Sequence, residues 1–288
     1  MRTIDLDSLE IFRSVVAEGG VIRAAEKLHR VQSNITTRIQ QLEGRLGHKL
    51  FHRQGRSLAL SPAGQKLLPY AERLLRLADE AESELRSDVP VGALRLGALE
   101  STAGSRLAPV LSRFHKLYPG VVVELATGTT AALLKRVNAY EIEAAFVAEP
   151  FTRAGLEALP VFDEELVLVT ARSVASVTSA SDLANATLIA FAQGCSYRRL
   201  LEQWLGKGGA MPSRSLEFSS YQAMISCVAA GTGFAIVPVS VLRALRATAQ
   251  VRQHALPAKM RRNRTHLVWH GTPSVALGRL IEMLDTST

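Results

Sequence analysis

The chain has 288 residues, of which 47% are hydrophobic and 21% are charged, and its formal net charge is +8. This composition is typical of a soluble globular protein, and no apolar run reaches the ~20 residues of a membrane helix. Collagen, coiled-coil rods, disordered tails, disulfide-rich secreted proteins and membrane proteins are therefore excluded. Two cysteines and an N-terminus without a secretory signal favour a cytoplasmic protein, and the length favours two or three domains.

The positive charge is concentrated near the N-terminus. Residues 19–60 hold eight Lys and Arg against two acids, a net +6, whereas residues 61–89 hold four cations and six acids, a net −2. A small basic unit followed by an acidic segment indicates a nucleic-acid-binding domain on a spacer. A second basic cluster, residues 243–264, has seven cations and no acid, and we interpret it as solvated surface.

Apolar residues at helical spacing predict three short helices before residue 48. They are Leu6, Leu9, Phe12 and Val16 in the first, Val21, Ala24, Ala25 and Leu28 in the second, and Ile35, Ile39, Leu42 and Leu46 in the third. Asp7 and Glu10 form a capping-box pattern, Ser33 is expected to cap the third helix, and Gly47 to end it. The second and third helices, joined by about three residues, form a helix-turn-helix unit.

The outer face of the third helix is polar. Its side chains are Gln32, Ser33, Asn34, Thr36, Thr37, Arg38 and Gln41. Amides and Arg make bidentate contacts to purines and hydroxyls reach phosphates or bases, although a polar face can also simply be solvated. Residues 50–60 predict a β-hairpin with a basic tip formed by Arg53 and Arg56 around Gly55, which is a wing. We therefore expect a winged helix-turn-helix domain over residues 1–60 that binds double-stranded DNA.

These motifs resemble the LysR-type transcriptional regulators. In order and spacing, the resemblance is carried by Leu9-Glu10-Ile11-Phe12, Ala24-Ala25-Glu26-Lys27-Leu28-His29, Gln32-Ser33, Ile39-Gln40-Gln41-Leu42-Glu43, Leu46-Gly47, Leu50-Phe51-His52-Arg53 and Leu60-Ser61-Pro62-Ala63-Gly64. It covers the head, and a weaker downstream pattern fits the family to the C-terminus. The string Asn34-Ile35-Thr36-Thr37-Arg38-Ile39 is also similar to a subgroup that includes regulators of putrescine and succinate-semialdehyde catabolism.

The resemblance implies which side chains touch operator DNA. They are Gln32, Ser33, Thr36, Thr37 and Arg53, to which the polar and basic surface adds Arg30, Asn34, Arg38 and Arg56. The turn His29-Arg30-Val31 departs from the family's usual His-Val-Ser, and Arg38 follows one position after the place where the family commonly has Arg.

Residues 61–89 predict one long helix. Ser61 is expected to cap it, Pro62 suits its first position, and Pro69 should bend it or delay its start. Small and apolar residues then recur at spacings of 4, 3, 4, 3 and 4, namely Leu67, Ala71, Leu74, Ala78, Ala81 and Leu85. Such a seam packs either on its own domain or on a second chain. The resemblance implies that it pairs two chains, and that the full assembly is a dimer of dimers.

From residue 90 onward, strands alternate with helices, which predicts an α/β domain with a parallel sheet. Strands are expected at 93–99, 121–126, 144–148, 165–170, 188–191, 234–237 and 266–270, and helices at 104–118, 130–139, 197–205, 223–230 and 274–284. The resemblance implies a periplasmic-binding-protein-like effector domain over residues 90–288. Its lobe I would span about 90–163 and 266–288, and its lobe II about 164–265.

Ligands of such sheets bind at the carboxyl ends of strands, where helix N-termini present free N–H groups. The candidate effector-binding residues in such positions are Glu100, Ser101, Thr102, Thr129, Thr130, Phe191, Ser196, Tyr197, Ser220 and Tyr221. Their hydroxyls suit a small carboxylate or another small polar effector, whereas Glu100 could pair with an amine. Each hydroxyl could equally be an ordinary helix cap.

Two alternative functions are compatible with parts of the sequence. Cys195 precedes a predicted helix, whose N-terminus can lower a thiol pKa, so a redox-sensing regulator is one alternative. No second Cys occurs before Cys227, which lies in an apolar helix. A solute-binding protein is the other alternative, against which the missing signal and the basic head argue.

No phosphate-loop, zinc-protease, nucleophile-elbow or Cys-x-x-Cys motif occurs, so we expect neither an enzyme nor a cofactor. His266 and His270 fall on a predicted strand without the spacing of metal ligands, so no metal is expected. The sequence thus predicts an effector-responsive transcriptional regulator. Its partners would be operator DNA, a small metabolite, further copies of itself and, if it activates, RNA polymerase, but no membrane.

Overall fold

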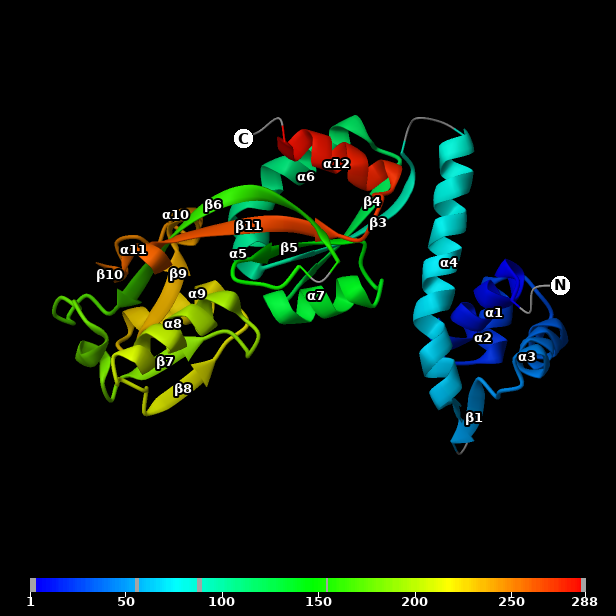
Figure 1. Cartoon of the computed structure of the whole chain (residues 1–288), viewed down its shortest axis with the longest axis horizontal. Coiled ribbons are helices and arrows are strands. Elements are labelled where there is room, and N and C mark those ends of the chain that lie inside the picture. The colour runs from blue at the N-terminus through cyan, green and yellow to red at the C-terminus, as the bar shows by residue number, and fades with distance from the viewer. Residues whose placement is uncertain (1–3, 55–56, 87–89, 154, 286–288) are drawn as a thin grey trace. The chain divides into compact units, whose positions relative to one another are not determined.

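The computed structural model describes residues 4–54, 57–86, 90–153 and 155–285 (Figure 1). The chain divides into two compact units, of which the first comprises residues 1–88 with 139–141 and the second residues 89–138 with 142–288. None of the helices within the described ranges has the length and apolar character needed to cross a membrane.

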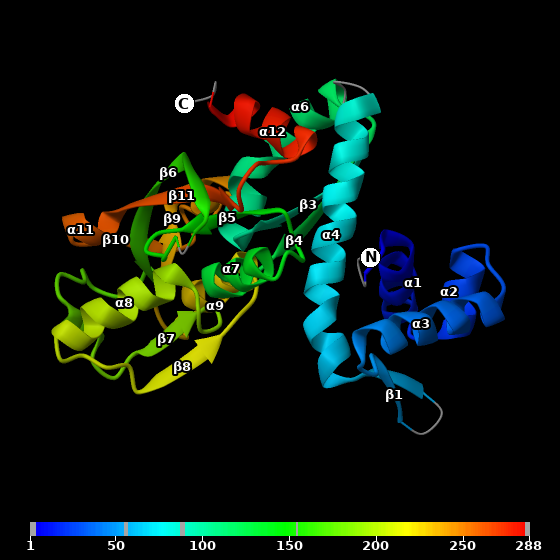
Figure 2. The ribbon, with the colours of Figure 1, turned by 45° about the vertical axis from the view of Figure 1, so that its right-hand side comes forward.

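The first unit contains a winged helix-turn-helix head and a long helix (Figure 2). Its elements are α1 (Leu6–Ala17), α2 (Val21–Lys27), α3 (Gln32–Leu46), β1 (Phe51–Gln54), β2 (Ser57–Leu60) and α4 (Pro62–Arg86). The predicted apolar stripes meet in one core, where Leu9, Ala24, Ile35 and Leu42 are completely buried, except that Leu6 of the first stripe is 48% exposed and lies outside this core. The Phe51 ring of the wing lies 5.4 Å from that of Phe12, so the wing packs on the same core. The sequence-based prediction of three helices and a hairpin is confirmed.

Two helix starts differ from the prediction. Asp5, rather than Asp7, caps α1, and its carboxylate accepts the Ser8 backbone N–H at 2.8 Å. This hydrogen bond is the main cause that lowers the pKa of Asp5 to about 2. α3 begins at Gln32 without a side-chain cap, so Ser33 lies inside the helix. Gly47 ends α3 as predicted, because it takes the left-handed φ of 68° that residues with a Cβ rarely adopt.

The long helix α4 starts as predicted. The Ser61 hydroxyl accepts the Gly64 backbone N–H at 3.0 Å, and a Cβ at Gly64 would collide with the Leu50 carbonyl oxygen. Pro69 lies inside α4 and does not delay its start.

The face of α4 that packs on the head begins with Ala63, which is partly buried against the head core. Ala71 and Leu75 are buried in the head core and Leu67 is partly buried against it, whereas Leu74 and Leu77 are 40% and 59% exposed. The predicted seam is therefore divided: Leu67 and Ala71 pack on the head of the same chain, whereas Leu74 is partly exposed. The side chain of Leu85 lies outside the described part of the chain.

The second unit is an α/β domain with helices on both faces of its sheet (Figure 1). Its strands are β3 (Gly92–Ala98), β4 (Val121–Thr127), β5 (Ala144–Ala148), β6 (Glu157–Thr170), β7 (Thr187–Ala190), β8 (Arg214–Glu217), β9 (Ala235–Pro238), β10 (Arg252–Ala255) and β11 (Arg262–Trp269). Its helices are α5 (Glu100–Thr102), the π-helix η1 (Ala103–Leu107), α6 (Ala108–Leu117), α7 (Thr130–Asn138), the 3-10 helix η2 (Ala180–Leu183), α8 (Ser196–Lys207), α9 (Tyr221–Ala229), α10 (Val239–Ala244), α11 (Ala258–Arg261) and α12 (Val275–Asp285). The helix predicted from residue 104 thus begins four residues earlier.

The main sheet is mixed, which corrects the prediction of a parallel one. Seven strands pair in the order β10-β6-β11-β5-β3-β4, with β9 also paired to β6. β3 runs parallel to β4 and β5, whereas β11 is antiparallel to β5 and to β6. The two long strands that cross between the lobes pair with each other directly, and this antiparallel ribbon needs no helical crossover.

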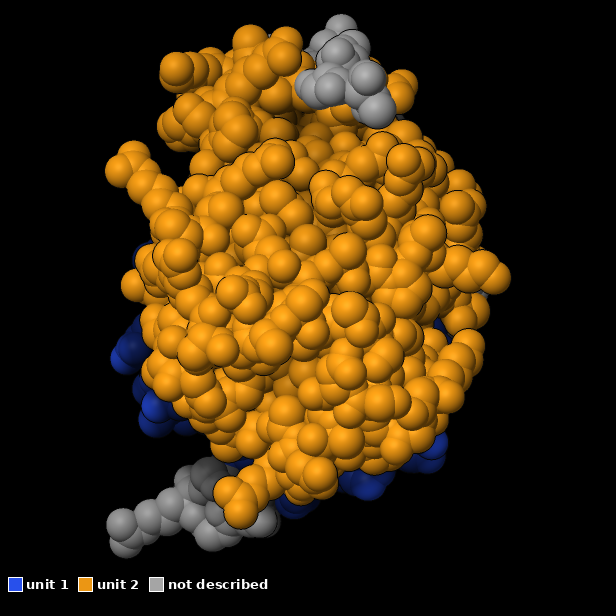
Figure 3. All heavy atoms as spheres, turned by 90° about the vertical axis from the view of Figure 1, so that its left-hand side faces the viewer, with its two compact units in different colours: residues 1–88, 139–141 blue, residues 89–138, 142–288 orange. Residues whose placement is uncertain are grey.

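The long strands β6 and β11 belong to both lobes. The first part of β6 pairs with β11, and from Leu166 onward it pairs with β9 and β10 of lobe II. α6 and α12 cover one face of the lobe I sheet, where Phe114 and Leu280 are fully buried. A second core joins Leu133 of α7 to Leu201 of α8, so apolar packing is continuous from lobe I to lobe II. Figure 3 shows one face of this unit as a closely packed surface.

Candidate DNA-reading surface and effector cleft

The recognition helix α3 is polar on the side opposite its buried stripe. Gln32, Ser33, Asn34 and Thr37 are exposed, as predicted. Thr36 is half-buried, and its hydroxyl donates to the Gln32 carbonyl at 3.0 Å, as expected for a helix-internal threonine. The exposed amides continue along α3 to Gln40, which lies one turn beyond Thr37 and was not among the sequence candidates. Helical periodicity alone would have placed it on this face.

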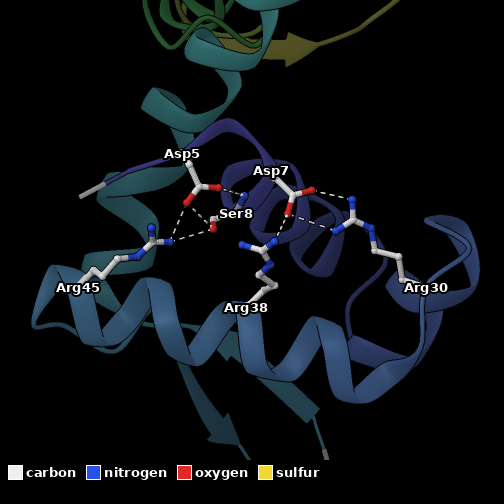
Figure 4. Close-up of polar contacts among 6 residues, drawn as sticks. All are labelled: Asp5, Asp7, Ser8, Arg30, Arg38 and Arg45. Carbon is white, nitrogen blue, oxygen red and sulfur yellow. Dashed lines mark hydrogen bonds and ion pairs between the residues drawn. The ribbon is translucent and has the colours of Figure 1, made fainter. Parts of the chain in front are cut away.

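Carboxylates of the first helix hold three arginines of the head (Figure 4). Arg30 makes a two-pronged contact with Asp7, at 2.6 and 3.2 Å, and Arg38 approaches the same carboxylate to 3.4 Å. Arg45, which the sequence did not single out, donates to Asp5 at 2.8 Å and to the Ser8 hydroxyl at 3.0 Å. The basic segment is thus partly neutralised by acids that precede it in the chain.

Two further cations of the head also form ion pairs. Lys27 binds Glu18 at 2.6 Å, and Lys49 binds Glu43 at 2.7 Å. Of the eight cations in residues 19–60, at least five have an acidic partner among the described residues, and the +6 of that stretch overstates the free charge that a polyanion would meet.

The wing is an antiparallel hairpin tied to the recognition helix. β1 pairs with β2 in the register Phe51↔Leu60 to Gln54↔Ser57. The Glu43 carboxylate of α3, only 7% exposed, accepts the backbone N–H of Leu50 at 2.8 Å. Of the two arginines predicted at the wing tip, Arg56 and the side chain of Arg53 lie outside the described part of the chain.

The structure brings most of the predicted cleft residues together, and it buries them. Six of them are at most 4% exposed, namely Ser101, Thr102, Thr130, Ser196, Tyr197 and Tyr221. The Ser196 hydroxyl of lobe II donates to the Thr130 hydroxyl at 3.0 Å and contacts the Ala148 carbonyl oxygen at 2.9 Å, both in lobe I. Glu100 of lobe I accepts the Tyr221 backbone N–H at 3.3 Å, and burial raises the pKa of Glu100. The two lobes are thus hydrogen-bonded to each other across the cleft.

Three other candidate effector-binding residues, Thr129, Phe191 and Ser220, do not take part in these contacts between the lobes. The Thr129 hydroxyl accepts the Ala132 backbone N–H at 3.3 Å, which is ordinary helix capping. Phe191 lies 4.7 Å from the Tyr221 ring, and Ser220 precedes α9 without a side-chain capping bond.

Two hydroxyls inside the cleft have no hydrogen-bond partner among the described residues. The Tyr197 hydroxyl lies near Ser101, Thr265 and Glu164 without forming a hydrogen bond to a described residue, and the Thr265 hydroxyl is unpaired as well. Burial is the main cause that raises the pKa of Tyr197 far above its usual range. Buried hydroxyls without partners are uncommon, and water or a ligand usually satisfies them. Thr265 and Glu164 were not predicted from the sequence, because long-range strand pairing brings them here.

Cys195 does not have the environment of a reactive thiol, which argues against the redox-sensing alternative. It stands at the start of α8 but is buried, and burial raises the pKa of its thiol despite nearby backbone N–H groups. The two histidines considered as metal ligands bind separate partners: His266 contacts Glu149 at 2.7 Å and His270 contacts Asn138 at 3.0 Å. No cluster able to hold a metal occurs among the residues that the structure describes.

A charged hollow of about 930 Å³ lies beside β6 and β11 and is lined by none of the predicted effector residues. Its walls are Glu149, Asp163, Glu164, Glu165, Ala258, Arg261, Arg262, Asn263 and Arg264. Arg261 pairs with Glu165 at 2.7 Å and Arg264 with Asp163 at 2.8 Å. The basic cluster of residues 243–264 therefore meets acids from the middle of β6, and its two pairing arginines are half exposed.

A winged helix-turn-helix head, a long helix and a two-lobed α/β domain whose lobes meet at buried polar side chains define a DNA-binding regulator that carries a ligand-binding domain. Residues 6–65 match the model of the bacterial regulatory helix-turn-helix protein, lysR family, and residues 87–287 match that of the LysR substrate binding domain. The chain belongs to the LysR family of transcriptional regulators.

Curated relatives agree with this assignment, and solved structures share the fold. The chain is 37% identical over 257 residues to the HTH-type transcriptional regulator GltR of Bacillus subtilis, covering 89% of this chain and 87% of GltR. It is 35% identical over 258 residues to CzcR of the same organism, covering 89% and 88%. A full-length OxyR variant from Pseudomonas aeruginosa has a TM-score of 0.76 at 22% identity, covering 100% and 95%. Full-length CbnR in complex with its target DNA has a TM-score of 0.68 at 24% sequence identity, and the match covers 99% of this chain and 100% of CbnR.

Proposed function

We propose that the chain reads operator DNA with α3 and the wing, and that a small polar metabolite in the cleft of the second unit modulates this binding. The exposed polar face of α3 carries the first part of the proposal. It presents amides, hydroxyls and arginine N–H groups, which match phosphate oxygens and the base edges of the major groove. The proposed contacts are Arg30, Gln32, Ser33, Asn34, Thr36, Thr37 and Arg38, with Arg53 and Arg56 from the wing.

Footprinting of the DNA upstream of the chain's own gene tests the first part. We expect protection of two half-sites about one helical turn apart, or a multiple of it, weakening steeply as salt rises. As a matched pair, Thr37→Ala should reduce protection of the specific site, whereas Gly44→Ala, further along the same helix where a Cβ meets no neighbour, should not. Uniform binding to any duplex would contradict sequence-specific reading.

The unpaired hydroxyls of Tyr197 and Thr265 support the second part. A small metabolite with both donors and acceptors would pair them, together with Ser101, at the place where both lobes meet. A panel of small metabolites screened by thermal shift should contain compounds that stabilise the wild-type chain and stabilise Tyr197→Phe less. Stabilisation that Tyr197→Phe leaves unchanged would place the ligand elsewhere.

We propose further that α4 pairs two chains. Tyr70, Leu74 and Leu77 are 64%, 40% and 59% exposed, and Ala78 and Ala81 continue this side of the helix. Of the other proposed seam residues, Leu67 and Ala71 would hold α4 on its own head, and Leu85 would extend the pairing surface near the C-terminal end of α4. In analytical ultracentrifugation, the double substitution Leu74→Glu, Leu77→Glu should reduce the assembly size, whereas Glu82→Gln should not. An unchanged sedimentation coefficient would contradict pairing through this face.

Pairing through α4 would give the dimer, and a second contact would give a dimer of dimers. A chain that reads DNA works in the compartment that holds it, the bacterial cytoplasm, and as an activator it would also meet RNA polymerase. A redox switch at Cys195 is not favoured, because its thiol is buried and its pKa is raised.

A further inference from the structure

Asp7, at the start of α1, holds two of the arginines in the proposed DNA-reading surface with a single carboxylate (Figure 4). One carboxylate oxygen binds Arg30 at 2.6 Å, and the other lies 3.2 Å from Arg30 and 3.4 Å from Arg38. The three side chains come from three places in the chain: α1, the turn after α2, and the middle of α3. The contact therefore fixes tertiary arrangement as well as side-chain conformation.

The carboxylate occupies few of the arginines' hydrogen-bond donors. A guanidinium has five N–H donors, so the pair has ten. Asp7 takes two from Arg30 and at most one from Arg38, and the remaining seven have no acceptor among the described residues. The side chains of Arg30 and Arg38 are 35% and 42% exposed, so both guanidinium groups are partly accessible to solvent. Free, oriented N–H groups beside a recognition helix fit phosphate oxygens and purine acceptors.

We propose that Asp7 is a positioning residue for DNA recognition: it holds Arg30 and Arg38 with their free N–H edges toward the duplex. Long arginine side chains lose rotamer freedom on binding, and an arrangement fixed beforehand reduces that loss. The negative charge of Asp7 acts in the opposite direction, because it repels every phosphate equally. Positioning and charge therefore affect specific and non-specific DNA differently, which makes the two separable.

This proposal rests on the proposed DNA-reading function, and its test uses the full chain with two duplexes. One duplex is selected by the wild-type chain from a random-sequence library, and the other has the same bases in scrambled order. Asp7→Asn should weaken binding to the selected duplex about 10-fold at constant salt, while binding to the scrambled duplex stays equal or tightens. The matched control is Glu26→Gln, an equal charge change at an exposed head residue, which should shift both affinities in the same direction.

Each outcome has a defined meaning. If Asp7→Asn keeps the wild-type ratio of the two affinities, as Glu26→Gln should, Asp7 contributes only charge and the proposal is overturned. If Asp7→Asn loses binding to both duplexes, Asp7 is needed for the fold of the head and the proposal is overturned. In that case Asp7→Glu, which keeps the charge, should also fail to restore the wild-type ratio of the two affinities. Arg30→Ala should cost less in the Asp7→Asn background than in the wild type. A wild-type chain that does not distinguish the duplexes would refute DNA reading itself.

Discussion

The wing is held against the recognition helix by one buried carboxylate, that of Glu43. It accepts the backbone N–H groups of Leu50 at 2.8 Å and Phe51 at 3.4 Å, and it pairs with Lys49 at 2.7 Å. Leu50 is 1% exposed, so Glu43→Ala would leave its N–H without an acceptor and without water. A hydrogen bond to a charged group contributes about 1.5–3 kcal/mol, and an unsatisfied buried donor costs about 1–3 kcal/mol.

These contributions overlap, because both describe the same N–H group, so we expect Glu43→Ala to destabilise the head by about 2–3 kcal/mol. In hydrogen exchange by mass spectrometry on the full chain, the Leu50 amide should then exchange roughly 30- to 150-fold faster, at 1.36 kcal/mol per factor of ten. The control is Glu26→Ala, which removes the same charge from an exposed position. Unchanged protection at Leu50 would refute the role of the carboxylate, because no other described acceptor is bonded to this N–H.

Three further predictions concern single groups. Tyr197→Phe removes a buried hydroxyl that has no partner, so the ligand-free second unit should gain about 1 kcal/mol in denaturant unfolding, and a loss of that size would show that the hydroxyl is satisfied. Burial raises the pKa of the Cys195 thiol, so iodoacetamide should alkylate it at least 10-fold more slowly than a free thiol at pH 8, as followed by peptide mass spectrometry; equal rates would show an accessible thiolate. The pKa of Asp5 is lowered from 3.8 to about 2, so its stabilising contribution is complete above pH 3.8 and is lost as the pH falls toward 2. Asp5→Asn should flatten this part of the acid-unfolding curve, and a curve of unchanged slope would contradict the assignment.

Local patterns were sufficient for the head. The stripe Ile35, Ile39, Leu42 defines α3 because each residue lies one turn from the next, and burial of that stripe leaves the polar face outward. The cap of α1 was misplaced by two residues, because Asp5 and Asp7 both stand near the start and only the extended backbone of Asp5 permits capping. Element types are therefore predictable here, whereas their first residues depend on backbone angles that the sequence does not display.

The sheet shows what local patterns leave undetermined. A buried strand has the same composition whether its neighbour runs parallel or antiparallel, so alternation with helices suggested a parallel sheet throughout. The pairing of Glu165 with Arg262 joins residues far apart in the sequence and makes the centre of the sheet mixed. Of the two unpaired hydroxyls, that of Tyr197 was among the candidates, whereas Thr265, which lies on β11 near Tyr197, was not, because only this long-range pairing places it there.

Charge counting along the sequence failed in a related way. Within residues 19–60 only two acids oppose eight cations, but Asp5, Asp7 and Glu18 lie just outside that window and bind Arg45, Arg30 and Lys27. Residues 1–60 hold ten Lys and Arg and six Asp and Glu, a net +4. For a surface that reads DNA, the number of oriented N–H groups without an acceptor is more informative than the net charge. An arginine and the carboxylate that holds it have no net charge as a pair. The arginine nevertheless still offers most of its N–H donors to a base or a phosphate.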